Sequence, residues 1–208
     1  MKLQLALDEM ELQEALDFAK EVEEYVDIFE IGTPFCLRSG VEAIEAFRKA
    51  FPNKEILADY KIMDAGDYEA EMAYNAGADY CVVLGVTDLL TIKGCDDAAK
   101  RMGKLSAVDL ICVDDLEKRV PQLEEIGVDV LAVHTGADLQ HAGRTPLGDL
   151  KEVKRLAKTS KISVAGGINS KTIADYVEVG PDIVIVGSAI CNNENPKEEA
   201  RLIKEALK

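Results

Sequence analysis

The sequence of 208 residues contains 39 Asp and Glu against 24 Lys and Arg, a formal net charge of -15. An acidic chain repels polyanions, so we expect no nucleic-acid partner and no binding to anionic membranes. With 48% hydrophobic residues, the chain can bury the core of one large domain, residues 1–208.

The cysteines and the first residues indicate the compartment. Five scattered cysteines include no Cys-x-x-Cys pair, which argues against a disulfide framework and a structural zinc site. Asp8 comes too early for a signal peptide, and no apolar run reaches membrane-spanning length. We therefore expect a cytoplasmic protein in a reducing environment.

One pattern repeats along the chain: a short apolar run, a polar corner and a segment with helical spacing of apolar residues. Eight runs predict strands, at residues 3–8, 28–33, 56–61, 80–86, 105–111, 130–135, 162–166 and 183–187. Four glycines precede the next run where a helix C-cap is expected, namely Gly77, Gly103, Gly127 and Gly180. Asn195 and Pro196 predict the start of the last helix. Eight units of about 26 residues favour a single (β/α)8 TIM barrel, with an open α/β sheet as the alternative.

The third predicted strand ends in Asp59-Tyr60-Lys61-Ile62-Met63-Asp64. In an extended strand Asp59 and Lys61 share a face, and Asp64 falls at the turn into the next helix. A surface ion pair would produce the same spacing, so the motif alone leaves both interpretations open. In a barrel, however, the carboxyl ends of the strands form the active site.

Polar residues also end other predicted strands. Glu30 and Asp59 come from adjacent strands and could bind one hard cation, which suits Mg²⁺. His134 is a candidate acid or base, because histidine is the residue type that most often transfers protons near neutral pH. Asp8 ends the first strand, and Asp109 could pair with Lys61 or with a backbone group.

Glycines end the last two predicted strands. Gly166 and Gly167 follow the seventh strand, and Gly187 and Ser188 follow the eighth. Glycine lets backbone N–H groups approach an anion, and these two corners often bind phosphate in TIM barrels. We therefore predict a phosphate site at these four residues.

Together these segments resemble the 3-hexulose-6-phosphate synthase family over essentially the whole chain. The similarity is carried by Leu5-Ala6-Leu7-Asp8, Glu30-Ile31-Gly32-Thr33-Pro34, Asp59-x-Lys61-x-x-Asp64-Ala65-Gly66, Val108-Asp109-Leu110-Ile111, His134-Thr135-Gly136-Ala137-Asp138-x-Gln140 and Val164-Ala165-Gly166-Gly167. The family is part of the orotidine 5'-monophosphate decarboxylase suprafamily, whose members share the Asp-x-Lys-x-x-Asp motif.

Flanking residues distinguish the activities in that suprafamily. The nucleotide decarboxylases typically have a lysine where this chain has Glu30. The 3-keto-L-gulonate-6-phosphate decarboxylases usually have arginines at the positions of Ala137 and Ser188. Both departures favour the synthase, and the keto-gulonate decarboxylase is the alternative.

The resemblance implies a Mg²⁺-dependent aldol reaction of formaldehyde with D-ribulose 5-phosphate, with Mn²⁺ as a possible substitute. It implies that Glu30 and Asp59 hold the metal, that Lys61 stabilises an enediolate and that His134 moves the C1 proton. Asp8 and Asp64 would orient the substrate and Lys61, with Asp109 as a further helper. It also implies a homodimer with shared active sites, in which Asp64 acts in the partner's site.

Two other classes of function remain open. Lys61 could form a Schiff base, as in metal-independent aldolases, although neighbouring carboxylates should keep it protonated. A non-catalytic barrel that binds a sugar phosphate is the second, but it would not need an acid, a lysine and a histidine in one basin.

Overall fold

Eight parallel strands close into a barrel in the order β1 to β8, as predicted. The computed structural model describes all residues, 1–208. The strands are β1 (Lys2–Leu7), β2 (Ile28–Ile31), β3 (Glu55–Ile62), β4 (Tyr80–Leu84), β5 (Leu105–Asp109), β6 (Val130–His134), β7 (Lys161–Ala165) and β8 (Ile183–Val186). The prediction of a (β/α)8 barrel is therefore confirmed.

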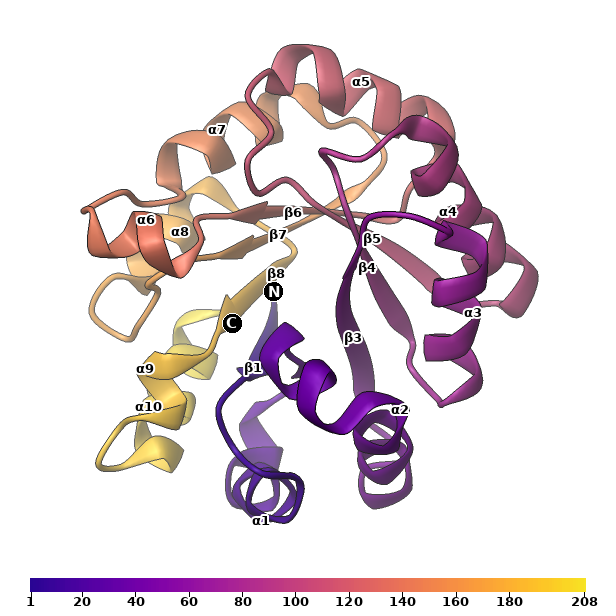
Figure 1. The fold of residues 1–208 in the computed structure, drawn as a ribbon. Coiled ribbons are helices and arrows are strands. Elements are labelled where there is room, and N and C mark those ends of the chain that lie inside the picture. The colour runs from indigo at the N-terminus through magenta and orange to yellow at the C-terminus, as the bar shows by residue number, and fades with distance from the viewer.

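Helices surround the strands on the outside (Figure 1). They are α1 (Leu12–Val22), η1 (Glu23–Tyr25), α2 (Thr33–Ala50), α3 (Gly66–Asn75), α4 (Leu89–Met102), α5 (Leu116–Ile126), α6 (Ala137–His141), α7 (Leu147–Leu156), α8 (Ile173–Val179), α9 (Ser188–Cys191) and α10 (Pro196–Ala206). The four predicted cap glycines all have positive φ, and the Asn195 side chain accepts a hydrogen bond from the Glu198 amide at 3.2 Å. None of the helices combines the length and the apolar character needed to cross a membrane.

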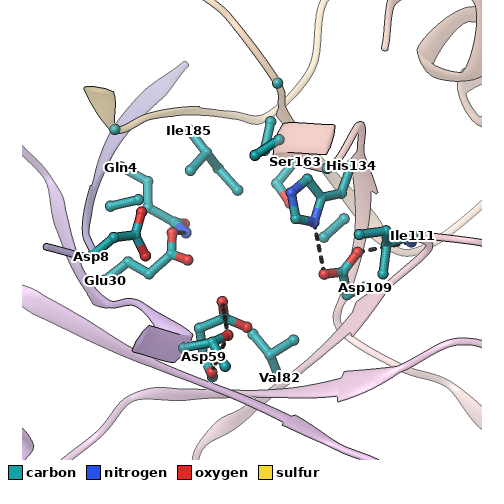
Figure 2. Close-up of a pocket in the computed structure, with 18 of the residues that line it drawn as sticks. Gln4, Asp8, Glu30, Asp59, Val82, Asp109, Ile111, His134, Ser163 and Ile185 are labelled. Carbon is teal, nitrogen blue, oxygen red and sulfur yellow. Dashed lines mark hydrogen bonds and ion pairs between the residues drawn. The ribbon is translucent and has the colours of Figure 1, made fainter. Parts of the chain in front are cut away.

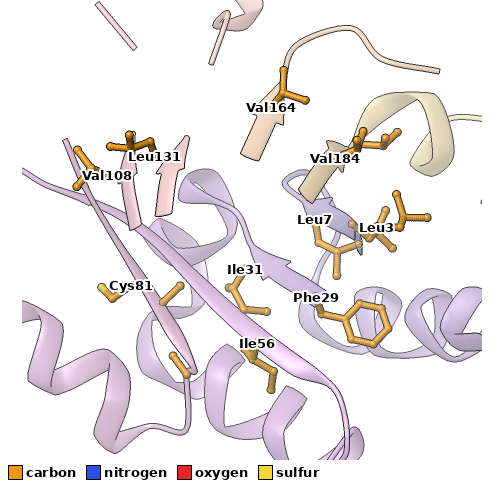
Figure 3. Close-up of a cluster of buried hydrophobic side chains, with 14 of the residues drawn as sticks. Leu3, Leu7, Phe29, Ile31, Ile56, Cys81, Val108, Leu131, Val164 and Val184 are labelled. Atoms are coloured by element: carbon orange, nitrogen blue, oxygen red, sulfur yellow. The ribbon is translucent and has the colours of Figure 1, made fainter. Parts of the chain in front are cut away.

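The alternation of side chains along each strand separates the core from the barrel interior. In β1, Leu3, Leu5 and Leu7 are fully buried beneath the helices, as are their counterparts in other strands (Figure 3). Gln4 and Ala6, on the other face, line the interior. A smaller apolar cluster fills the bottom of that interior, made of Ile28, Leu57, Tyr80, Val82, Ala107, Val130 and Ile183. The inward-facing side chains nearer the carboxyl ends of the strands are therefore available to form a site at the top of the barrel.

Four aspartates, one directly before each even-numbered strand, tie the bottom of the barrel together. Each carboxylate accepts the backbone N–H of the second residue of the preceding strand, over 2.7–3.0 Å. Each backbone carbonyl accepts the N–H of the first residue of the next odd-numbered strand. We call Asp27, Asp79, Asp129 and Asp182 the aspartate ring. Because the bottom of a TIM barrel contributes stability, the ring holds a rigid base beneath the site.

Candidate active site

A cavity of about 680 Å³ opens at the carboxyl ends of the strands. Residues from all eight strands line it. Figure 2 shows Asp8, Gln4 and Glu30 on one side of the cavity, His134 with Asp109 on the opposite side, and Asp59 between them. The cavity therefore brings together the strand-end residues singled out in the sequence.

Asp59 and Lys61 form an ion pair, with 2.5 Å between Asp59 Oδ2 and Lys61 Nζ. They do not meet through simple strand alternation. The pairing of β3 with β4 shifts register between Ala58 and Ile62, and Lys61 has a left-handed φ of 47°. A β-bulge of this kind re-aims a side chain beside an active site, which is what it does for Lys61.

The other oxygen of Asp59 has no hydrogen-bond partner. The residue is buried, and Oδ1 is the one buried side-chain polar atom left unsatisfied in the structure. On Oδ2, by contrast, Thr33 Oγ1 lies at 2.8 Å. An unpaired buried carboxylate oxygen is costly, so this atom suits a ligand that supplies positive charge.

Glu30 is buried next to Asp59, with 8% of its surface exposed. Its Oε2 accepts a hydrogen bond of 2.7 Å from the Gln4 side-chain amide. Burial, together with the nearby charge of Asp59, raises the pKa of Glu30 to about 8. Two acids in such surroundings repel one another, and a bound cation would relieve that repulsion.

The two carboxylates of Glu30 and Asp59 suit Mg²⁺ better than they suit a metal ion that is coordinated by protein ligands alone. No group of three or more His, Cys, Asp or Glu side chains is arranged to hold a metal ion. Glu30 and Asp59 could supply two carboxylates, leaving the remaining positions to water and substrate. Mg²⁺ commonly binds in this way.

Asp109 joins Lys61 to His134. Asp109 Oδ2 lies 2.9 Å from His134 Nδ1 and 3.6 Å from Lys61 Nζ, and Oδ1 accepts the Ile111 N–H at 2.9 Å. Burial alone would raise the pKa of Asp109, but His134 and Lys61 outweigh it and lower the pKa below its usual value. Asp109 is therefore an acceptor, so Nδ1 of neutral His134 carries the proton and Nε2 is left with a lone pair.

Lys61 remains an ammonium ion. Burial lowers its pKa, but the charges of Asp59 and Asp109 outweigh this effect and raise the pKa above the usual value. An ammonium ion stabilises negative charge and does not attack a carbonyl group. This arrangement argues against the Schiff-base alternative.

Asp8 lines the cavity beside β2. Burial, with the charge of Asp59, raises its pKa. A side chain at position 32 would collide with it, because a Cβ on Gly32 would lie 2.0 Å from Asp8 Oδ1. Gly32 thus makes room for the Asp8 carboxylate.

Asp64 lies apart from the other predicted site residues. It is exposed, is absent from the cavity lining, and accepts a hydrogen bond only from the neighbouring Ala65 amide. Within one chain, therefore, the structure gathers Asp8, Glu30, Asp59, Lys61, Asp109 and His134 but not Asp64. The second histidine of the chain, His141 at the end of α6, is exposed and lies outside the cavity lining.

The predicted phosphate residues Gly166, Gly167, Gly187 and Ser188 all line the cavity. Gly166 and Gly167 have φ values of 134° and 68°, which favour glycine. The backbone amides of Gly167, Ile168 and Gly187 donate to no protein acceptor. This corner therefore offers several N–H groups to an anion.

The sequence matches known proteins over its full length. Residues 1–203 match the family described as Orotidine 5'-phosphate decarboxylase / HUMPS family. The chain belongs to this family. Among its members, the 3-hexulose-6-phosphate synthase of Staphylococcus haemolyticus is 47% identical over 207 residues, 100% of this chain and 99% of the relative.

Solved structures of family members agree with the fold. A 3-hexulose-6-phosphate synthase from Salmonella typhimurium has a TM-score of 0.98 and 56% identity, covering 100% of this chain and 98% of that one. A structure of KGPDC from Streptococcus mutans has a TM-score of 0.92 and 29% identity, covering 99% of this chain and 96% of that one. The resemblance stated from the motifs is therefore confirmed.

Three polar contacts at the site were not predicted from the sequence, although Thr33 and Gln140 belong to the motifs that carry the family resemblance. Gln4 bonds Glu30, Thr33 bonds Asp59, and Gln140 Nε2 donates to the Thr135 carbonyl at 2.7 Å beside the cavity. A signal existed for Gln4, which alternates with Ala6 and Asp8 on the inward face of an apolar strand. Thr33 and Gln140 lie beyond their strands, where alternation gives no direction.

Proposed function

We propose that this protein catalyses the reversible aldol addition of formaldehyde to D-ribulose 5-phosphate, which gives D-arabino-hex-3-ulose 6-phosphate. Full-length relatives with this activity in their names are 44–56% identical to it. The observation that carries the mechanism is the chain of contacts from Asp59 through Lys61 and Asp109 to His134. These contacts support the mechanism because they hold the Lys61 ammonium group and a basic nitrogen of His134 in one cavity.

In this proposal His134 Nε2 removes a proton from C1 of ribulose 5-phosphate. Asp109 holds the ring and stabilises the imidazolium that forms. Lys61 lies where negative charge develops on the enediolate oxygens. C1 then forms the new bond to the formaldehyde carbon, and the imidazolium returns its proton to the resulting alkoxide. Asp8 would orient the substrate hydroxyls.

Glu30 and Asp59 would hold the metal. Mg²⁺, or Mn²⁺ with the same oxygen ligands, supplies Lewis-acid polarisation of the substrate carbonyl when bound. The unpaired Oδ1 of Asp59 and the raised pKa of Glu30 support this assignment. The amides of Gly167, Ile168 and Gly187, with Ser188, would bind the phosphate.

A homodimer with shared active sites is part of the proposal. Asp64 is exposed and does not line its own cavity, and exposed apolar side chains occur in the neighbouring segments. These are Met63 just after β3, Tyr68 and Met72 on α3, Val86 in the loop after β4, and Leu90 on α4. Exposed apolar clusters of this kind mark interfaces, and a two-fold partner would bring Asp64 to the second site.

One experiment tests the function directly. We would compare kcat/KM for formaldehyde with ribulose 5-phosphate against kcat/KM for 3-keto-L-gulonate 6-phosphate, with and without EDTA. We expect the aldol substrates to be preferred and EDTA to abolish turnover. Higher efficiency with the keto acid would contradict the aldol assignment, and a borohydride-trapped adduct would establish the Schiff-base route.

A further inference from the structure

A buried carboxylate on the last helix holds the loop that follows β7. Glu199, on α10, is 9% exposed. Its Oε1 accepts the Ser170 backbone N–H at 2.7 Å, and its Oε2 accepts the Ser170 Oγ–H at 2.8 Å. The contact joins segments 29 residues apart in the sequence. Glu199 does not line the cavity, so it does not reach the substrate itself.

Ser170 ends the stretch from Gly166 to Ser170, which we call the phosphate loop. Inside the loop, Ile168 is 2% exposed and packs into the main apolar core. The next residue, Asn169, donates its backbone N–H to Thr172 Oγ1 at 3.1 Å. The amides of Gly167 and Ile168, which donate to no protein acceptor, thus lie between the end of β7 and the anchor at Ser170.

This arrangement fixes two amides before a ligand arrives. Gly166 and Gly167 have positive φ values and impose little conformational preference of their own. Without a distant anchor, the loop would become ordered only when an anion binds. The binding free energy would then have to offset the entropy lost in ordering the loop. The Glu199 carboxylate removes part of that cost by holding Ser170 through two hydrogen bonds.

We infer that Glu199 is a positioning residue for substrate binding, acting by holding the phosphate loop in its anion-binding conformation. The inference rests on the proposed function, because it assigns the loop to the phosphate of a phosphorylated sugar. Glu199 should affect substrate binding and not the chemical step, since the reacting carbons would lie at Lys61 and His134. The negative charge of Glu199 is not needed, because a glutamine can accept the Ser170 N–H and donate to its Oγ.

The test compares Glu199→Ala, Glu199→Gln and the control Glu198→Ala. Glu198 is the next residue on α10, and its side chain is half-exposed and pairs with Arg201. We expect Glu199→Ala to raise KM for ribulose 5-phosphate about tenfold, as for loss of other supporting contacts, with kcat unchanged within about twofold. Glu199→Gln and Glu198→Ala should both stay within about twofold of the wild type.

Inorganic phosphate provides a second measurement that needs no turnover. Titration followed by ³¹P NMR should show about tenfold weaker binding to Glu199→Ala, and Ser170→Ala provides a milder variant if that protein does not fold. Unchanged phosphate affinity in a folded variant would overturn the inference. A fall in kcat as large as the rise in KM would also overturn it. If the wild type binds phosphate but does not use formaldehyde, the proposed function fails while the phosphate titration still decides the role of Glu199.

Discussion

The Gln4 side-chain amide donates a hydrogen bond of 2.7 Å to Glu30 Oε2 inside the barrel. Gln4 is 1% exposed and Glu30 is 8% exposed. The bond occupies one carboxylate oxygen and leaves the other available at the cavity beside Asp59. Gln4 therefore orients a proposed metal ligand from one layer below it.

Replacing Gln4 by methionine should weaken metal binding. Gln4→Met removes the donor at similar volume, so the Glu30 carboxylate loses its orientation. We expect about tenfold weaker binding of Mn²⁺, measured by electron paramagnetic resonance without substrate. Ser163→Ala, on the inward face of β7, is the control and should bind Mn²⁺ like the wild type. Equal affinity in Gln4→Met would show that Glu30 needs no support.

Glu30→Gln tests the metal ligand itself. The variant keeps the shape of the side chain but removes one of two proposed anionic ligands, so cation affinity must fall. We expect the Mg²⁺ concentration for half-maximal activity to rise by about tenfold or more. A metal dependence equal to that of the wild type would exclude Glu30 as a ligand.

His134→Asn tests the base. Asparagine can still hydrogen-bond to Asp109 but cannot accept a proton from carbon at neutral pH. We expect exchange of the C1 proton of ribulose 5-phosphate into heavy water, followed by NMR, to slow by about 100-fold or more, while substrate affinity changes little. Exchange at the wild-type rate would assign the base to another residue.

Asp64 should act in the active site of the partner subunit. Lys61→Ala and Asp64→Ala should each be nearly inactive as separate dimers. Random exchange between equal amounts makes half of the dimers mixed, and each mixed dimer has one intact site. The mixture should therefore recover about a quarter of the wild-type activity.

The same mixture distinguishes the opposite arrangement. If Asp64 served its own subunit, every site in the mixed dimers would carry one defect and no activity would return. Subunit exchange is verified independently with tagged chains. Inactivity despite verified exchange would show that the sites are not shared.

Glu124 should contribute stability that depends on pH. Its carboxylate, on α5, accepts hydrogen bonds from the backbone amides of Lys158, Thr159 and Ser160 and from the Thr159 hydroxyl. Burial opposes the shift, but these bonds lower the pKa of Glu124 from 4.5 to about 2. The stabilisation is thus fully present above pH 4.5 and is lost as the pH falls through about 2.

Chemical denaturation of Glu124→Gln would measure this effect. We expect a loss of about 1 kcal/mol in the free energy of unfolding at pH 7, kept small because solvent screens the carboxylate. The difference from the wild type should shrink as the pH falls towards 2. A constant difference at all pH values would exclude the ionised carboxylate as its source.

The barrel could be predicted from the sequence because each strand is a short apolar run and four helices end at a glycine. The order of the strands then follows from the repeat, since parallel neighbours need a crossover helix. The ends of the strands were less predictable. The fourth and fifth strands were expected to reach residues 86 and 111 but end at Leu84 and Asp109. Apolar residues continue beyond both strands, so composition does not mark the end.

In the candidate site, residue types could be predicted but their contacts could not. Strand alternation correctly placed Glu30 and Asp59 on the inward face, where both line the cavity. It could not predict the bulge at Lys61, because a left-handed lysine has no signal in local composition. The link between Asp109 and His134 depends on the spacing of neighbouring strands and was not predicted, because only Lys61 or a backbone group was expected to pair with Asp109.

The aspartate ring also divides the chain into four equivalent quarters. Each of its carboxylates joins an odd-numbered strand to the next even-numbered strand, so every bond from a strand N–H to the ring lies within one pair: β1–β2, β3–β4, β5–β6 or β7–β8. A cut between α4 and β5 separates two halves of the barrel without breaking any of these links. The proposed active site uses residues from both halves, because Lys61 belongs to one half and its partner Asp109 belongs to the other. Neither half alone can therefore assemble the chain of contacts from Asp59 to His134.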